Sequence, residues 1–69
     1  MTKRRDVVRA LMAAGFEPDG GTNHERYVHA DGRWTVVPWH REVREQTVRL
    51  IERQTGVSVM RVIDGGRSR

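Results

Sequence analysis

The 69-residue sequence contains no cysteine, which excludes both a disulfide framework and a thiolate metal site. Its uninterrupted apolar runs are only a few residues long, so no segment is suited to crossing a membrane. The basic residues 3–5 are followed by no apolar stretch of the kind found in signal peptides. These absences predict a soluble protein of the cytoplasm.

Apolar residues make up 36% of the chain, which is enough for one small hydrophobic core. A chain of this length buries only ~60% of the surface that its unfolded form exposes, so a deep, enclosed active site is not expected. We predict a single domain over residues 1–64. Residues 65–69 have no apolar side chain to bury and are predicted to form a disordered tail.

Positive charge exceeds negative charge in this sequence. Thirteen Lys and Arg residues against nine Asp and Glu residues give a formal net charge of +4 at pH 7. Twelve of the thirteen are arginine, whose planar guanidinium group suits phosphate. The first partner that this composition suggests is therefore a polyanion.

Residues 3–14 have the pattern of an amphipathic helix, with apolar side chains recurring every three or four positions. Thr2 is expected to cap its start. Gly15 is expected to end it, with Phe16 folding back in a Schellman-type stop. The basic side chains on its polar side are expected to form a solvated face, which holds Lys3, Arg4, Arg5 and Arg9.

A short edge strand and a hairpin are predicted next. Residues 16–21 contain a proline and paired glycines, which allow only a short edge strand. Residues 24–30 and 33–38 are two extended segments around Asp31-Gly32, a dipeptide typical of a two-residue hairpin turn. Such a turn pairs Ala30 with Arg33, and the further pairs that it predicts are His29–Trp34, Val28–Thr35 and Tyr27–Val36.

This pairing predicts which side chains share each face of the hairpin. The face with the larger, aromatic side chains is assigned to the core, and it holds Tyr27, His29, Trp34 and Val36. The open face then holds His24, Arg26, Val28, Arg33, Thr35 and Val37. A one-residue bulge would reverse this assignment.

A second amphipathic pattern follows Pro38, runs from Val43 to Gln54 and is predicted to end at Gly56. Residues 57–63 are rich in β-branched side chains, and their imperfect alternation fits either a further strand or an extended arm. The predicted order is helix, three short strands, helix. This order describes an α+β two-layer sandwich, with an extra C-terminal strand as one option.

The histidines are the candidates for chemistry. The run from His24 to His29 resembles the zincin motif H-E-x-x-H, but it is one residue longer and is predicted to be a strand, which places its two imidazoles on opposite faces. Neither a metal site nor a cofactor is therefore predicted. His24 remains, in a polar turn on the open face. A surface histidine is more often an ordinary polar residue, but imidazole can transfer protons in both directions near neutral pH.

Several short elements, taken in order, resemble the HicA toxins of HicA/HicB toxin-antitoxin pairs over residues 7–56. These elements are Gly15-Phe16, Gly20-Gly21-Thr22-Asn23-His24, Asp31-Gly32, Val37-Pro38-Trp39-His40, Thr47-Val48-Arg49-Leu50-Ile51 and Gly56. The resemblance implies a double-stranded-RNA-binding-domain-like fold of α-β-β-β-α order. It also implies an endoribonuclease, an mRNA interferase that does not need the ribosome, and a HicB-type antitoxin as its protein partner. Because no metal site is predicted, cleavage is expected to need no metal.

The resemblance places the single catalytic histidine at His24. Arg26 and Arg33, on the predicted open face, are expected to contact RNA phosphate. Asn23 and His40, which lie on matching motif positions, are also expected to contact RNA. His40 also fits a structural role beside the strand-to-helix turn, and that role is preferred to catalysis.

Trp39 stands where the family usually has arginine, which removes one candidate phosphate contact. Its side chain fits either a half-buried lid on the core or a platform for an unpaired base, and the first role is favoured.

Three functions are compatible with these features. The first is an endoribonuclease in which His24 takes the proton of a 2′-hydroxyl or returns one to the leaving oxygen. The second is an RNA-binding module of the same fold without cleavage. The third is a protein-interaction element whose basic face binds an acidic partner. The enzyme is the first choice, and RNA fragments formed in the presence of a chelator would separate it from the other two.

Overall fold

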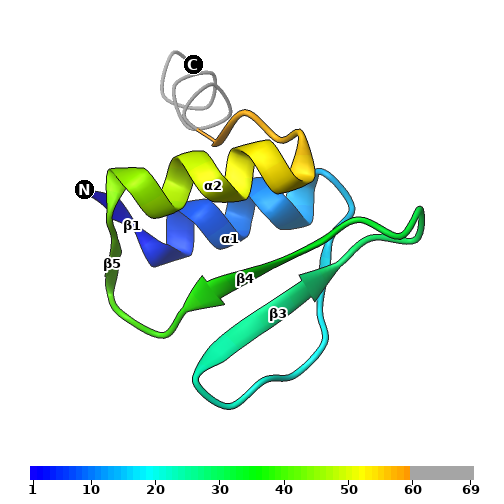
Figure 1. Ribbon diagram of the computed structural model, residues 1–69, viewed down its shortest axis with the longest axis horizontal. Helices are drawn as coiled ribbons and strands as arrows, with labels where there is room; N and C mark the ends of the chain where they lie inside the picture. Colours follow the sequence, from blue (N-terminus) through cyan, green and yellow to red (C-terminus); the bar gives the residue numbers. More distant parts are fainter. Residues whose placement is uncertain (60–69) are drawn as a thin grey trace.

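The computed structural model describes residues 1–59, which form two helices, a three-stranded antiparallel sheet and a separate pair of short antiparallel strands. Both helices lie along one side of the sheet, so the fold has two layers (Figure 1). The elements are β1 (Thr2–Lys3), α1 (Arg4–Ala13), β2 (Glu17–Pro18), β3 (His24–Val28), β4 (Trp34–Pro38), β5 (Glu42–Val43) and α2 (Glu45–Thr55). This confirms the predicted α+β class and the α-β-β-β-α order, to which the short β1 and β5 strands are added.

Helix α1 agrees with its predicted bounds to within one residue at each end. Its end is a Schellman motif, because the Phe16 amide donates to the Leu11 carbonyl at 3.0 Å while Gly15 takes a φ of 96°. Its start differs from the prediction. Lys3 occupies the N-cap position with no side-chain cap hydrogen bond, and Thr2 lies in β1 opposite Val43.

The hairpin between β3 and β4 has a longer loop than predicted. The His29 amide donates to the Arg33 carbonyl at 2.9 Å, so residues 30–32 form a three-residue loop in which Gly32 takes a φ of 101°. The prediction of a two-residue turn is therefore wrong. The observed register pairs Val28 with Trp34 and Tyr27 with Thr35, one position from the predicted pairing.

This shift reverses the predicted faces of β4 but leaves those of β3 unchanged. Thr35 and Val37 are fully buried on the helix side, whereas Trp34 is 56% exposed and Val36 is 37% exposed. The assignment of Trp34 and Val36 to the core is therefore wrong, and the physical reason is the period of two in a strand, where a slip of one residue exchanges the faces. Tyr27 is buried as predicted.

Helix α2 packs on the sheet through its buried side chains Val48, Ile51 and Thr55, and it ends at Gly56 in the left-handed conformation, φ 76°. Leu50 lies on the outer side of the helix and is 48% exposed. The segment before α2 contains β5, which was not predicted. It pairs with β1 and so joins the starts of both helices.

The hydrophobic core fills the space between the helices and the sheet. Its apolar side chains are Val7, Ala10, Leu11, Phe16, Tyr27, Val37, Val43, Val48, Ile51, Val57 and Val59. The part of the predicted strand or arm at residues 60–63, the domain boundary at residue 64 and the predicted tail at 65–69 lie outside the described residues. None of the helices in residues 1–59 is long and apolar enough to cross a membrane.

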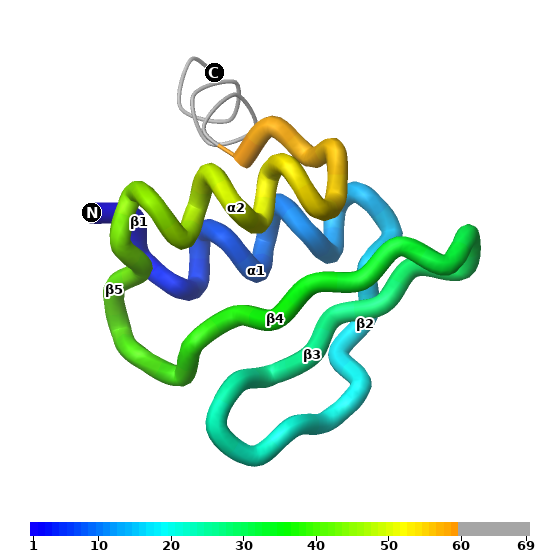
Figure 2. The backbone as a smooth tube through the Cα atoms, viewed as in Figure 1, coloured from blue at the N-terminus to red at the C-terminus, as the bar shows by residue number. Residues whose placement is uncertain are grey.

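The two ends of the hairpin lie at opposite ends of the molecule. The three-residue loop extends beyond the helices at one end, while β1, β5 and the N-terminus occupy the other (Figure 2). Chain segments far apart in the sequence therefore meet at the β1/β5 end.

Candidate functional site

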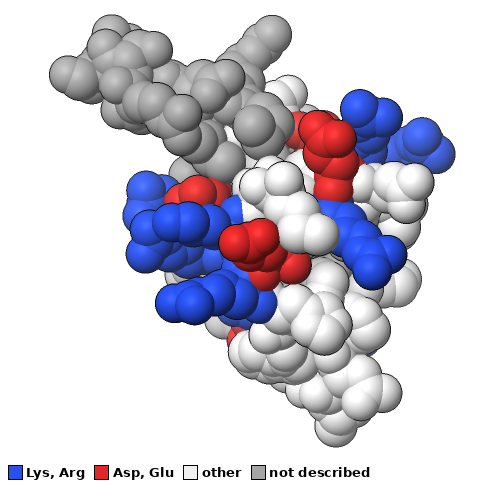
Figure 3. Space-filling view, turned by 90° about the vertical axis from the view of Figure 1, so that its left-hand side faces the viewer, with Lys and Arg blue, Asp and Glu red and all other residues white. Residues whose placement is uncertain are grey.

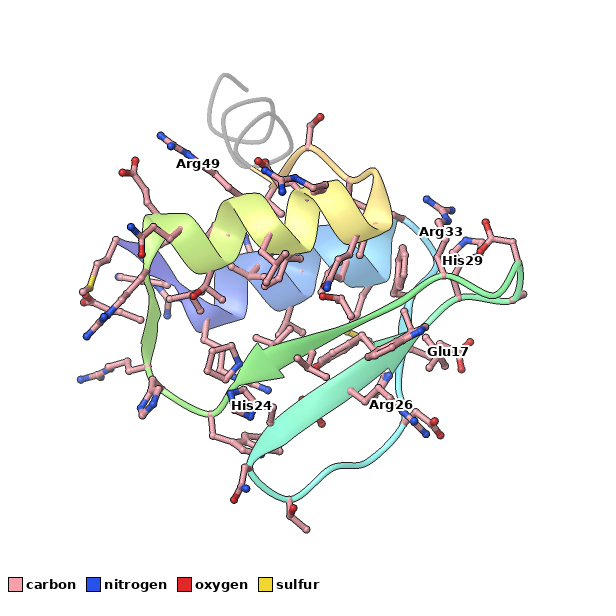
Figure 4. All side chains as sticks on the ribbon, in the orientation of Figure 1. Glu17, His24, Arg26, His29, Arg33 and Arg49 are labelled. Atoms are coloured by element: carbon pink, nitrogen blue, oxygen red, sulfur yellow. The ribbon has the colours of Figure 1, made fainter. Side chains whose placement is uncertain are left out.

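His24 is the first residue of β3, where it is exposed and pairs with Pro38, the last residue of β4. It shares its side of the strand with Arg26, and that side is the open face of the sheet, as predicted. Figure 4 places the His24 side chain at the end of the hairpin away from the loop. The imidazole is therefore open to a large ligand lying on the surface.

A tight glycine loop brings the chain to His24. The Asp19 amide donates to the Arg26 carbonyl at 2.7 Å, and the Arg26 amide donates to the Gly20 carbonyl at 2.7 Å, so two residues of one segment share one partner in β3. Gly21, with a φ of 116°, lies so close to β3 that an added Cβ would be 2.0 Å from the His24 carbonyl oxygen. Only glycine permits this approach, and it sets the position from which β3 starts.

His29 has a different environment from His24. Its ring contacts Phe16 edge-on, with the ring centroids 5.0 Å apart, and its Nδ1 atom accepts a hydrogen bond from the Asp31 amide at 3.1 Å. The side chain is only 22% exposed and lies at the loop end of the hairpin (Figure 4). His24 and His29 thus point to opposite faces of the hairpin, and residues 1–59 contain no group of three His, Cys, Asp or Glu side chains suited to holding a metal.

The two arginines expected to contact phosphate are both engaged in ion pairs. Arg26 lies on the open face, and its Nη2 atom is 2.6 Å from Asp19 Oδ2, with about half of each side chain exposed. Arg33 is not on the open face, because the register shift turns it to the helix side. There its guanidinium donates to the Thr55 carbonyl and to Asp31 Oδ2 (2.8 Å).

Arg33 therefore links the hairpin to the end of α2. Its guanidinium carbon also lies 5.3 Å from the centroid of the Phe16 ring. Hydrogen bonds from the Arg33 backbone amide and then its guanidinium hold the pKa of Asp31 below its ordinary value. These contacts describe a side chain that holds the loop in place.

The other predicted contact residues are exposed. Asn23 precedes β3 and His40 lies between β4 and β5, and neither side chain forms a hydrogen bond or ion pair with the described part of the chain. Trp39 is 51% exposed and is not among the apolar side chains that pack on the core, so the favoured role as a lid on the core is wrong. Its ring instead packs against Arg4, whose guanidinium carbon is 4.4 Å from the ring centroid.

A polar cluster on the helix side of the sheet was missed by the sequence analysis. Arg4, predicted to lie on a solvated helix face, donates from Nη2 to Glu25 Oε1 at 2.6 Å and from Nε to the Pro38 carbonyl at 2.9 Å. The Tyr27 hydroxyl donates to the same Glu25 oxygen at 2.7 Å. The cluster thus ties the start of α1 to the strand ends that carry His24.

The cluster perturbs the titration of its members. The hydrogen bond from Tyr27, followed by that from Arg4, holds the pKa of Glu25 below its ordinary value. Burial, followed by the hydrogen bond to Glu25, raises the pKa of Tyr27 to about 12. The sequence did contain a signal for this cluster. Glu25 and Tyr27 are two residues apart in a predicted strand, so their side chains lie on the same face, the one that packs against the helices.

Comparison with known proteins identifies the family. No curated protein sequence matches the chain. The sequence model of the family described as "HicA toxin of bacterial toxin-antitoxin" matches residues 4–57, which include His24 and both helices. The matched segment is most of the chain and has the α-β-β-β-α order described above. The chain therefore belongs to the HicA toxin family of bacterial toxin-antitoxin systems.

Proposed function

We propose that this protein is an endoribonuclease that cleaves mRNA and uses His24 for proton transfer. The observation that carries the proposal is the placement of His24 within the family match, as an exposed imidazole at the end of the sheet. His29 packs on Phe16 and is largely covered, so it is poorly placed for contact with a substrate. As a substrate, mRNA would place the protein in the cytoplasm.

The chemistry asks for a proton acceptor and for cations. His24 takes the proton of a 2′-hydroxyl, the freed oxygen attacks the adjacent phosphorus, and the bond to the 5′ oxygen breaks as that oxygen receives a proton from solvent. Cationic side chains stabilise the charge that develops on the phosphoryl oxygens. None of these steps requires a deep, enclosed pocket, which is not expected in a chain of 69 residues.

The experiment that tests the proposal compares the wild-type protein with His24→Ala on a structured RNA. Loss of a general acid or base lowers rates by ~10²- to 10⁴-fold, and we expect a loss in this range. Because His24 is exposed, the free energy of unfolding should change by less than ~0.5 kcal/mol. Imidazole added to the solution should restore part of the rate, and cleavage should persist in EDTA.

Three results would contradict the proposal. The first is a rate of RNA cleavage by His24→Ala that equals the wild-type rate. The second is cleavage by the wild type that disappears when the chelator is added. The third is a loss of cleavage that circular dichroism traces entirely to unfolding.

We also propose that a HicB-type antitoxin inhibits the protein by covering the open face of the sheet. Trp34 and Val36 are exposed there beside Arg26, and an exposed apolar patch with a polar border is typical of protein interfaces. A cover at this position would also block His24. Hydrogen exchange on the complex should show protection around residues 22–28, whereas protection confined to the outer sides of the helices would refute this mode of inhibition.

A further inference from the structure

A cleft of about 510 Å³ lies at the β1/β5 end of the molecule. Its lining residues are Lys3, Arg4, Arg5, Arg41 and Glu42, and we call it the N-terminal cleft. Figure 3 looks onto this end, where Lys and Arg side chains lie on both sides with acidic side chains between them. The cleft combines residues of β1, the first turn of α1 and the segment that leads into β5, so only the folded chain assembles it.

The charge of the N-terminal cleft is largely uncompensated. Its lining holds four cations and the carboxylate of Glu42. Arg4 is already paired with Glu25, so three cations remain against one carboxylate. The side chains of Lys3, Arg5 and Arg41 are exposed, and none of them forms an ion pair with any residue in 1–59. Arg26 and Arg33, by contrast, already have carboxylate partners. The N-terminal cleft is therefore better suited to an external polyanion than the arginines of the hairpin.

The N-terminal cleft adjoins the strand end that carries His24. The Arg4 backbone amide donates to the Arg41 carbonyl at 2.8 Å, and its side chain donates to the Pro38 carbonyl at 2.9 Å. Pro38 is the cross-strand partner of His24. Trp39, half exposed and stacked on Arg4, lies on the same border. Arg4 thus connects the cleft to the strand end that carries His24.

We propose that the N-terminal cleft binds the backbone phosphates of the RNA strand that flanks the bond presented to His24, an inference that rests on the proposed function for the choice of RNA. Lys3, Arg5 and Arg41 supply the cationic contacts. Contacts to phosphate carry no direct sequence information, so this cleft positions the RNA and does not select bases.

The test measures binding of a short single-stranded 2′-O-methyl RNA to the full chain by fluorescence anisotropy at several salt concentrations. This RNA lacks the reacting hydroxyl and stays intact. The variant is Arg5→Gln/Arg41→Gln. The matched control is Arg49→Gln/Arg53→Gln, which removes the same charge from two exposed residues of α2 that do not line the cleft, and Figure 4 shows Arg49 pointing away from the sheet.

Each phosphate contact on a single strand contributes about 0.7 to the slope of log affinity against log salt, so the cleft variant should lose about 1.4 from this slope. If the plots of log affinity against log salt for the wild type and the cleft variant meet near 1 M salt, the variant binds RNA roughly 25-fold more weakly than the wild type at about 0.1 M salt. The control should keep the wild-type slope. Thermal unfolding of both variants should match the wild type, because the replaced side chains are exposed.

Four results would overturn the inference. The wild type does not bind the RNA, or the cleft variant binds it with wild-type affinity. Alternatively, the cleft variant and the control lose RNA affinity equally, or the cleft variant still binds RNA but no longer binds the antitoxin. Equal weakening would mean that net charge alone matters, and selective loss of the antitoxin would mean a protein interface. The proposed function fails separately, if His24→Ala cleaves RNA at the wild-type rate.

Discussion

The cluster of Arg4, Glu25 and Tyr27 should contribute a large part of the stability of this small domain. Arg4→Met keeps much of the aliphatic stem but removes the hydrogen bonds to Glu25 at 2.6 Å and to the Pro38 carbonyl at 2.9 Å. A hydrogen bond to a charged group contributes ~1.5–3 kcal/mol. The Arg4 and Glu25 side chains are each 19% exposed, so we take the lower end of that range for each bond.

The sum is a loss of about 3 kcal/mol in the free energy of unfolding. In a domain of this size such a loss lowers the melting temperature by roughly 12–24 °C. Glu25→Gln should cost less, because the amide oxygen still accepts hydrogen bonds from Arg4 and from Tyr27. The double variant should reveal a coupling energy of about 1–2 kcal/mol between Arg4 and Glu25, since the two side chains are in direct contact.

The coupling should depend on pH with a definite sign. The Tyr27 and Arg4 hydrogen bonds hold the pKa of Glu25 below its ordinary value of 4.5. The folded state therefore binds this proton less readily than the unfolded state, so the stabilisation is present above pH 4.5 and is lost as the pH falls through the lower, folded value. The difference between wild type and Arg4→Met should shrink accordingly in acid.

Urea unfolding followed by circular dichroism, at about pH 7 and about pH 3, measures these quantities for the wild type, both single variants and the double variant. Effects at neutral pH that add to within ~0.5 kcal/mol would refute the coupling. An Arg4→Met difference that is unchanged in acid would refute the assignment of the ionised carboxylate as its source.

Three further results are expected. Gly21→Ala should destabilise the fold by ~1–3 kcal/mol in a thermal melt, because its methyl group would meet the His24 carbonyl, while Gly20→Ala, with no atom within 4 Å of its added Cβ, should cost less. Tyr27 is the single tyrosine, and its pKa is raised to about 12 in the folded state from an ordinary value of 10.0. Because the unfolded state loses this proton first, the free energy of unfolding should fall between pH 10 and pH 12 by up to ~1.4 kcal/mol per pH unit. Tyr27→Phe should abolish this fall. His29→Ala should lower stability by ~1–2 kcal/mol through its lost ring contact and leave the rate of RNA cleavage unchanged; a rate loss as large as that of His24→Ala would contradict the assignment.

Much of the local structure could be predicted from the sequence, because periodic apolar residues and glycine breaks are local signals. Both helices, the stop at Gly15, the short edge strand and the hairpin around Gly32 followed from such patterns. The exposure of His24 at the start of β3 was predicted for the same reason.

The tertiary structure decided the register of β4 and the partners of the arginines. One additional loop residue moved Trp34 to the open face and Arg33 to the helix side, because side chains in a strand alternate and a slip of one exchanges the faces. The clustering of Arg4 with Glu25, and of Lys3 and Arg5 with Arg41, joins residues more than twenty positions apart. No local pattern encodes such contacts, since they form only when the packed helices and sheet bring the start of the chain against the ends of the strands.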